Sequence, residues 1–212
     1  MEIKAYENKL FNQLDQSGKT FSNKEFYKCK FEKSNFSECS FNRVDFSNCT
    51  FNDCDFTQAD LTNIDFTDSH FINCNFTLTK MRGTGLKVIN FDNCKIMGID
   101  FSITNDFMFA VKFNESYLDY STFFGKKMKN TLFSDCSVKE VDFTRVDLTG
   151  SIFKNCDLTS AIFLQSTIEK VDFTTAKNYS IDPEQNKIKN AKFSISDLPG
   201  LLTKYNIKVH HS

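Results

Sequence analysis

The sequence lacks the long apolar segments that a membrane protein needs. No run of about 18 apolar residues occurs in the 212 residues, and the N-terminal stretch carries Lys4, Glu7 and Lys9 in place of an apolar signal region. The formal net charge is only −1, and charges of both signs alternate along most of the chain. These features predict a cytoplasmic protein with no membrane partner, and they argue against a generally basic nucleic-acid binder.

Groups that could perform catalysis are also scarce. Of the three histidines, His70 lies in a position expected to face outward, while His210 and His211 fall in the last three residues. There is no glycine-rich phosphate loop, no HExxH motif and no nucleophile elbow. The aspartates are many but belong to a repeat, whereas a hydrolase needs them in a concave pocket that excludes water. The sequence therefore predicts a protein that is not an enzyme and that has no cofactor or metal.

The eight cysteines contain no CxxC pair, and all of them stand two residues before a large apolar residue. They are Cys29, Cys39, Cys49, Cys54, Cys74, Cys94, Cys136 and Cys156. In other repeats the same slot holds mostly Ser, Val, Ala, Thr or Ile, which are residues of modest volume. Because a free cysteine behaves as a small buried hydrophobe, we expect these thiols to be reduced, inward-facing and without metal.

What the chain does have is a large apolar residue at every fifth position. One series runs from Phe21 to Phe101 and a second from Phe113 to Phe173, with 17 and 13 members, or 30 repeats in all. A period of five fits neither a helix nor a strand, so the chain must turn after each short extended piece. The pattern predicts one elongated solenoid in which each coil contacts only its neighbours.

The corners of this solenoid have their own signal. Asn, Asp or Gly follows the apolar residue by two positions in 14 of the 30 repeats. These residue types tolerate the positive φ that a tight turn requires. The apolar residue and the slot two positions before it are therefore predicted to point inward, and the flanking polar residues outward.

Individual repeats resemble those of a known family. The segments CDFTQ (54–58), ADLTN (59–63) and VDFTR (141–145) are similar to the repeats of pentapeptide-repeat proteins, and the resemblance spans about residues 19–177. It implies an all-β fold, a right-handed quadrilateral β-helix with four repeats per coil. Thirty repeats would then make seven to eight coils.

The register breaks once, where two extra residues enter within 102–108. One interpretation is a tolerated insertion at a corner, and the other is a surface feature that displays Phe107 or Phe109 to a partner. The break divides the chain into an N-terminal cap segment (1–18), a first stack (19–103), a second stack (104–177) and a C-terminal cap and dimerisation module (178–212).

The tail changes character. Residues 194–205 are predicted as a helix with Ser196 or Asp197 as N-cap and Pro199 in its first turn, and residues 207–209 alternate as a short edge strand does. An open solenoid end must be covered or paired. We therefore expect the tail to cap the last coil and to join two copies into a homodimer. The apolar residues of this interface are Leu198, Leu201, Leu202, Ile207 and Val209.

Negative charge is concentrated in residues 44–79, which contain six aspartates and no lysine or arginine. If four repeats close a coil, residues four repeats apart share a face, so Glu25, Asp45 and Asp65 should form a column with Asp68 beside it. Carboxylates ~5 Å apart approach the charge density of a nucleic-acid backbone. The alternative is that these are simply solvated aspartates of the repeat. The candidate acidic face for partner binding comprises Glu25, Asp45, Asp55, Asp60, Asp65 and Asp68.

Within the family, the chain most resembles the quinolone-resistance type (Qnr-like and MfpA-like). The resemblance rests on its length, the single register break and the tail sequence LPGLLTKYNIKV. It implies a DNA-mimicking rod that binds DNA gyrase or topoisomerase IV, protects against fluoroquinolones and does not itself contact nucleic acid. The alternative is a scaffolding repeat protein that binds an unrelated partner through flat faces. Outward apolar residues favour it, namely Leu132, Ile152, Ile162 and Leu164.

Overall fold

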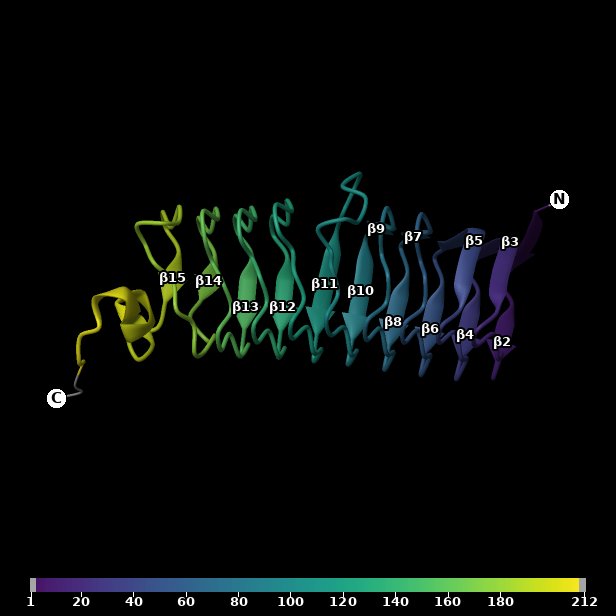
Figure 1. Ribbon diagram of the computed structural model, residues 1–212, viewed down its shortest axis with the longest axis horizontal. Coiled ribbons are helices and arrows are strands. Elements are labelled where there is room, and N and C mark those ends of the chain that lie inside the picture. The colour runs from purple at the N-terminus through teal and green to yellow at the C-terminus, as the bar shows by residue number, and fades with distance from the viewer. Residues whose placement is uncertain (1–2, 210–212) are drawn as a thin grey trace.

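The chain forms a parallel β-solenoid in the computed structural model, which describes residues 3–209. Figure 1 shows an elongated stack of coils with the two ends of the chain at opposite ends of the stack. Strands of successive coils pair in parallel, with Phe26 opposite Phe46 and Phe46 opposite Phe66. Because these partners stand four repeats apart in the sequence, four repeats make one coil. The all-β quadrilateral β-helix predicted from the repeats is confirmed.

The coil has four faces, two of which carry continuous sheets. The first face carries β1 (Lys4–Glu7), β3 (Thr20–Tyr27), β5 (Ser40–Ser47), β7 (Asp65–Thr67) and β9 (Gly85–Lys87). The second face carries β2 (Leu10–Asn12), β4 (Lys30–Glu32), β6 (Thr50–Asn52), β8 (His70–Ile72), β10 (Ile89–Asp92), β11 (Val111–Asn114), β12 (Leu132–Ser134), β13 (Ile152–Lys154), β14 (Asp172–Phe173) and β15 (Lys192–Phe193). β3 and β5 begin on the fourth face, where Phe21 lies opposite Phe41, and continue onto the first. Elsewhere single bridges join the coils on the third face, as at Asp55↔Asn75, and on the fourth, as at Asp60↔Lys80.

The ten-stranded sheet shows that the solenoid is longer than the seven to eight coils predicted. Residues 4–18, within the segment interpreted as an N-terminal cap, form a coil of their own. The Tyr6 ring stacks on Phe26 at 5.1 Å, and the Phe11 ring on Phe31 at 4.9 Å. The apolar series did not reveal this coil, because Gln16 occupies the position five residues before Phe21 where a large apolar residue was expected.

The core consists of ladders of stacked rings. Every residue of the two apolar series is buried. Along one face the rings lie parallel, as at Phe101 and Phe123, whose centroids are 4.4 Å apart. Rings on adjacent faces meet edge to face, as at Phe46 and Phe51 at 5.2 Å and 73°. Both arrangements are favourable for aromatic pairs. All eight cysteines are buried and unpaired, as the slot predicted.

The corners have positive φ at residues of many kinds. Lys28, Leu78 and Val88 have φ between 52° and 59°. This region is unfavourable for most side chains, and above all for the β-branched side chain of Val88. Backbone N–H groups at the corners donate hydrogen bonds to the next coil. The Lys28 N–H donates to the Ser47 carbonyl, and the Leu78 N–H donates to the Met97 carbonyl. Hydrogen bonding between coils thus holds the turn where the residue type alone would not.

The register break is a projecting loop. The two extra residues make the sequence separation between stacked partners longer here than in the other coils, so that Phe91 lies opposite Phe113. The loop of residues 102–109 lies between β10 and β11 and projects from the stack (Figure 1), although Thr104 within it stays buried. Phe107 and Met108 are 66% and 60% exposed, whereas Phe109 packs against the core. Of the two phenylalanines considered for display, only Phe107 is presented to solvent.

The tail differs in part from its prediction. The single predicted helix is two short 3-10 helices, η1 (Leu198–Leu201) and η2 (Thr203–Tyr205). Asp197 occupies the N-cap position, but its carboxylate accepts hydrogen bonds from the Ser194 and Ser196 hydroxyls and not from the helix. The edge strand predicted at 207–209 is absent from the single chain, where these three residues have no regular secondary structure. His210 and His211 lie outside the described residues. Across residues 3–209 we find no helix with the length and apolarity to cross a membrane.

Candidate partner-binding surface

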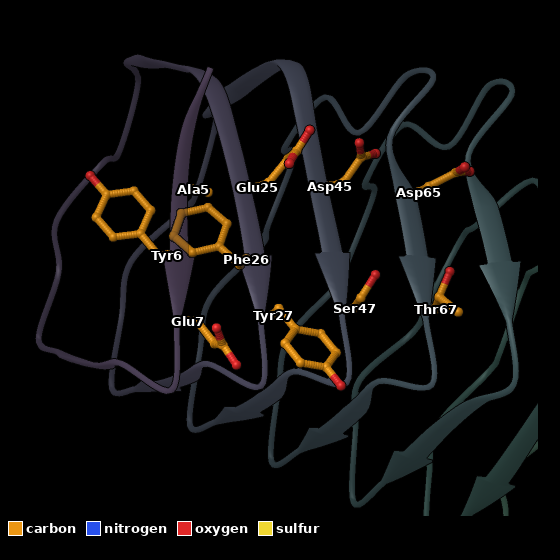
Figure 2. Close-up of a pocket in the computed structure, with 10 residues that line it drawn as sticks. All are labelled: Ala5, Tyr6, Glu7, Glu25, Phe26, Tyr27, Asp45, Ser47, Asp65 and Thr67. Carbon is orange, nitrogen blue, oxygen red and sulfur yellow. The ribbon is translucent and has the colours of Figure 1, made fainter. Parts of the chain in front are cut away.

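The first face carries a row of three carboxylates, which we call the acidic column: Glu25 on β3, Asp45 on β5 and Asp65 on β7. Their Cα atoms are direct register partners, Glu25 with Asp45 and Asp45 with Asp65. Figure 2 shows the three side chains projecting from successive strands on the same side of the sheet. The column therefore repeats negative charge at the strand spacing of about 4.8 Å.

A shallow hollow of about 580 Å³ lies along this column. Its other lining residues are Ala5, Tyr6, Glu7, Phe26, Tyr27, Ser47 and Thr67. Short outward side chains, among them Ala5 and Ser47, leave room for it. Glu7 adds a fourth carboxylate that the sequence reasoning missed, because Glu7 fell in the segment assigned to a cap. Glu7 stands four repeats before Tyr27, which is its register partner. This spacing could have placed Glu7 on the first face from the sequence alone.

The carboxylates of the acidic column affect one another. Burial between neighbouring strands raises the pKa of Asp45, and the charges of Asp65 and Glu25 raise it further. Lys87 acts in the opposite direction, and its Nζ lies 2.7 Å from Asp65 Oδ2. The column ends at Gly85, the register partner of Asp65, where a side chain would collide with the Asp65 carboxylate. The result is a compact negative site with a lysine at one end.

The other three residues of the predicted acidic face lie elsewhere. Asp68 is at the corner that follows β7, next to the column and exposed. Asp55 lies on the third face and Asp60 on the fourth. Each of these two uses Oδ1 to accept the N–H two residues ahead, from Thr57 at 2.9 Å and Thr62 at 3.0 Å. The six residues thus do not form one face, because the chain turns a corner after every repeat.

The residues predicted to form a dimer interface lie together at the C-terminal end. Leu198, Leu202, Ile207 and Val209 are exposed, while Leu201 packs against the core of the last coils. Gly200 lies so close to Tyr179 that a side chain there would collide with it. The tail thus covers the coil with one leucine and presents the other apolar residues outward. Their pairing with a second copy stays a prediction.

The outward apolar residues that favour a scaffold are divided between two faces. Leu132 and Ile152 are register partners on the second face, whereas Ile162 pairs with Asp142 on the fourth. Ile152, Ile162 and Leu164 are exposed. Within residues 3–209, no group of three or more His, Cys, Asp or Glu side chains is placed to hold a metal ion. The hollow beside the acidic column is lined by four carboxylates, those of Glu7, Glu25, Asp45 and Asp65.

Four-sided coils, inward ring ladders and positive-φ corners define the chain as a β-solenoid built from five-residue repeats. The family model described as a pentapeptide repeat region matches residues 17–71, 44–123 and 104–173. The chain belongs to the pentapeptide-repeat family.

Solved structures of other repeat proteins also match. Full-length QnrB1, described as a plasmid-mediated fluoroquinolone resistance protein, has the same fold, with a TM-score of 0.56 and 15% identity over 96% of this chain and 100% of QnrB1. HetL, a pentapeptide-repeat protein of the cyanobacterium Nostoc sp. strain PCC 7120, matches at 14% identity over 91% of this chain and 88% of HetL, with a TM-score of 0.28. A search of the curated proteins finds no match.

Proposed function

We propose that this protein is a DNA-mimicking binding protein that acts in the cytoplasm on DNA gyrase or topoisomerase IV and protects the enzyme against fluoroquinolones. The observation that carries the proposal is the acidic column, in which Glu25, Asp45 and Asp65 are register partners on successive strands. Its charge spacing of about 4.8 Å is close to the ~3.4 Å per phosphate of one DNA strand. The likeness in fold to QnrB1 supports the same proposal.

The rigidity of the rod favours such mimicry. The carboxylates stand on a sheet whose inner side is filled by stacked rings, including Phe26, Phe46 and Phe66. A partner that binds them has little ordering to impose, which lowers the entropic cost of association. Negative charge on one face also attracts a DNA-binding surface over a distance and raises the association rate. The column thus favours binding over catalysis.

A dimer would extend this surface. The acidic column lies on β3, β5 and β7, toward the N-terminal end of the stack (Figure 1), and the apolar tail lies at the other end. Joining two copies through Leu198, Leu201, Leu202, Ile207 and Val209 would therefore place the two columns toward opposite ends of a longer rod. In this arrangement one dimer presents two equivalent negative sites.

The test is a supercoiling assay of gyrase and a relaxation assay of topoisomerase IV in a fluoroquinolone, with the purified full chain titrated in. We expect activity to recover with increasing protein, and direct binding to weaken as salt is raised, because salt screens the charges. Absence of binding to both enzymes would contradict the proposal.

Scaffolding is the second candidate, and the exposed Ile152, Ile162 and Leu164 favour it. Substituting these three by Ser leaves the acidic column unchanged. If the protein binds neither topoisomerase but captures another protein from lysate, and the three substitutions abolish that capture, the scaffold function replaces the first proposal.

A further inference from the structure

The projecting loop vacates one core position of the first face. The inward column of this face contains Phe66 and Leu86 below the loop and Met128 and Leu148 above it, all buried. The residue in register between them is Met108, which is 60% exposed. Phe109 packs against the core near the vacated position, and a cavity of about 120 Å³ remains beside Phe109 and Met128. Core packing of Met108, the residue in register, therefore does not hold the loop.

The backbone ladder shows what does so. One coil below, the Thr84 carbonyl accepts the Asn105 N–H at 3.0 Å, and one coil above, the Lys126 carbonyl accepts the Asp147 N–H at 2.9 Å. At the equivalent position between them, the Thr104 carbonyl accepts a hydrogen bond from the side-chain ammonium of Lys126, with Nζ at 2.7 Å. The ammonium thus takes the place of a backbone N–H at the one coil where the ladder is displaced.

Lys126 is unusual for the slot it occupies. It stands two residues before Met128, in the slot that most other repeats fill with cysteine or another residue of modest volume, and it is only 2% exposed. Lys19 and Lys24 occupy the same slot, but Lys19 is exposed and Lys24 only half-buried. Burial of an ammonium is costly unless it is paired and hydrogen-bonded. Besides the Thr104 carbonyl, its Nζ contacts Asp106 Oδ1 at 2.6 Å and lies 4.9 Å from the centroid of the Phe109 ring. All three partners belong to the loop segment, so the lysine is satisfied only while the loop is in place.

We propose that Lys126 is a positioning residue that holds the loop of residues 102–109 as an ordered projection presenting Phe107 and Met108. The loop is also placed relative to the acidic column, because Lys87, which pairs with Asp65, has its Nζ 5.8 Å from the Phe107 ring centroid. The lysine acts from the coil above and not from within the loop. Lys126 has this role in the free protein, whichever partner binds.

The experiment compares amide hydrogen exchange in the full chain and in Lys126→Met, which keeps an unbranched side chain, shorter by one bond, but removes the ammonium. Exchange within residues 102–110 should become about tenfold faster, while β12 and β13 keep wild-type exchange, since only the loop loses a hydrogen-bonded anchor. Chymotrypsin should then cut after Phe107 more rapidly. The matched control is Lys127→Met, which removes the neighbouring exposed lysine and should exchange as the wild type does.

Two further variants complete the test. Lys126→Arg keeps a charged donor and should preserve slow exchange in the loop. Lys126→Gln has the same length as the Met variant but a polar end, so it gives the same comparison should the Met variant fail to fold, and it too should loosen the loop. Unchanged loop exchange in both the Met and Gln variants would overturn the proposal. So would acceleration spread equally over β10 to β13, because Lys126 would then be an ordinary core residue.

Discussion

Cysteine serves in this protein as a small core residue. Burial raises the pKa of Cys39 to about 11 and that of Cys49 to about 12, and it raises the pKa of Cys74 well above its usual value. Since the thiolate is the reactive form, these thiols should be unreactive in the folded protein. Because all eight cysteines are buried, we expect a maleimide reagent to label them only after denaturation, as measured by intact mass. Rapid labelling of several cysteines in the native protein would contradict the inward slot.

Asp45 should make stability fall as pH rises. Because its pKa is raised in the folded state, that state binds the proton more tightly than the unfolded chain does, and its stability declines from the ordinary carboxyl pKa of 3.8 upward through the raised value. Asp45→Asn should therefore increase Tm at pH 7 and reduce the pH dependence above pH 3.8.

The control for this prediction is Asp172, whose pKa is lowered by hydrogen bonds from the Thr174 hydroxyl and N–H. Its stabilising contribution is present at neutral pH and is lost as pH falls, so Asp172→Asn should not increase Tm at pH 7. Thermal unfolding of the two variants between pH 3 and pH 7 checks both signs. A lower Tm for Asp45→Asn at pH 7 would contradict this account of the column.

At the scale of the element, the ring ladders should dominate stability. Phe66→Ala and Phe143→Ala each remove a fully buried ring that stacks on the coils next to it, and should each cost ~3–5 kcal/mol of unfolding free energy. The outward Thr67→Ala should cost little. Denaturant unfolding measures the differences, and equally small losses in all three variants would show that the inward assignment is wrong.

The tail should join two copies of the chain into a dimer. Ile207 and Leu202 are exposed in the single chain, so Leu202→Asp together with Ile207→Asp should leave the solenoid folded while adding charge to the proposed interface. Light scattering after size exclusion should give a dimer for the full chain and a monomer for the double variant. A full chain that is monomeric at high concentration would refute the dimer.

Local pattern predicted the repeating elements well, because each repeat carries its own core residue and its own corner. It did less well where the structure depends on distant residues. The corner at Leu78 is held by the hydrogen bond from its N–H to the Met97 carbonyl of the next coil, and the 102–109 loop contacts Lys126, which also belongs to the next coil. The strand expected at 207–209 needs a neighbour that one chain does not supply.

The acidic face was predicted only in part for a related reason. Counting charge along residues 44–79 grouped Asp55 and Asp60 with Asp45, although each lies on a different face. The four-repeat register correctly selected Glu25, Asp45 and Asp65. In a solenoid, position modulo the coil length decides which side chains meet, and density along the sequence does not.

At the scale of the whole molecule, a rod of near-neutral net charge concentrates three carboxylates on one face near one end. Its function is therefore expected to depend on where charge lies and not on how much the protein carries. A charge reversal at this face can be compared with the same reversal elsewhere. Glu38, Glu115 and Glu140 are suitable for the comparison, because they are exposed corner residues with positive φ, a position that Lys28 and Lys170 also occupy.

The most direct measurement is binding to gyrase, with fluoroquinolone protection alongside, for two triple variants of equal charge change. Glu25→Lys, Asp45→Lys and Asp65→Lys together should keep the fold, because no inward residue changes, but should greatly weaken binding, flatten its salt dependence and abolish protection. Glu38→Lys, Glu115→Lys and Glu140→Lys together should bind and protect much as the wild type does. A folded column variant that protects as well as the wild type, or equal losses in both variants, would contradict the proposal that the acidic column is the binding surface.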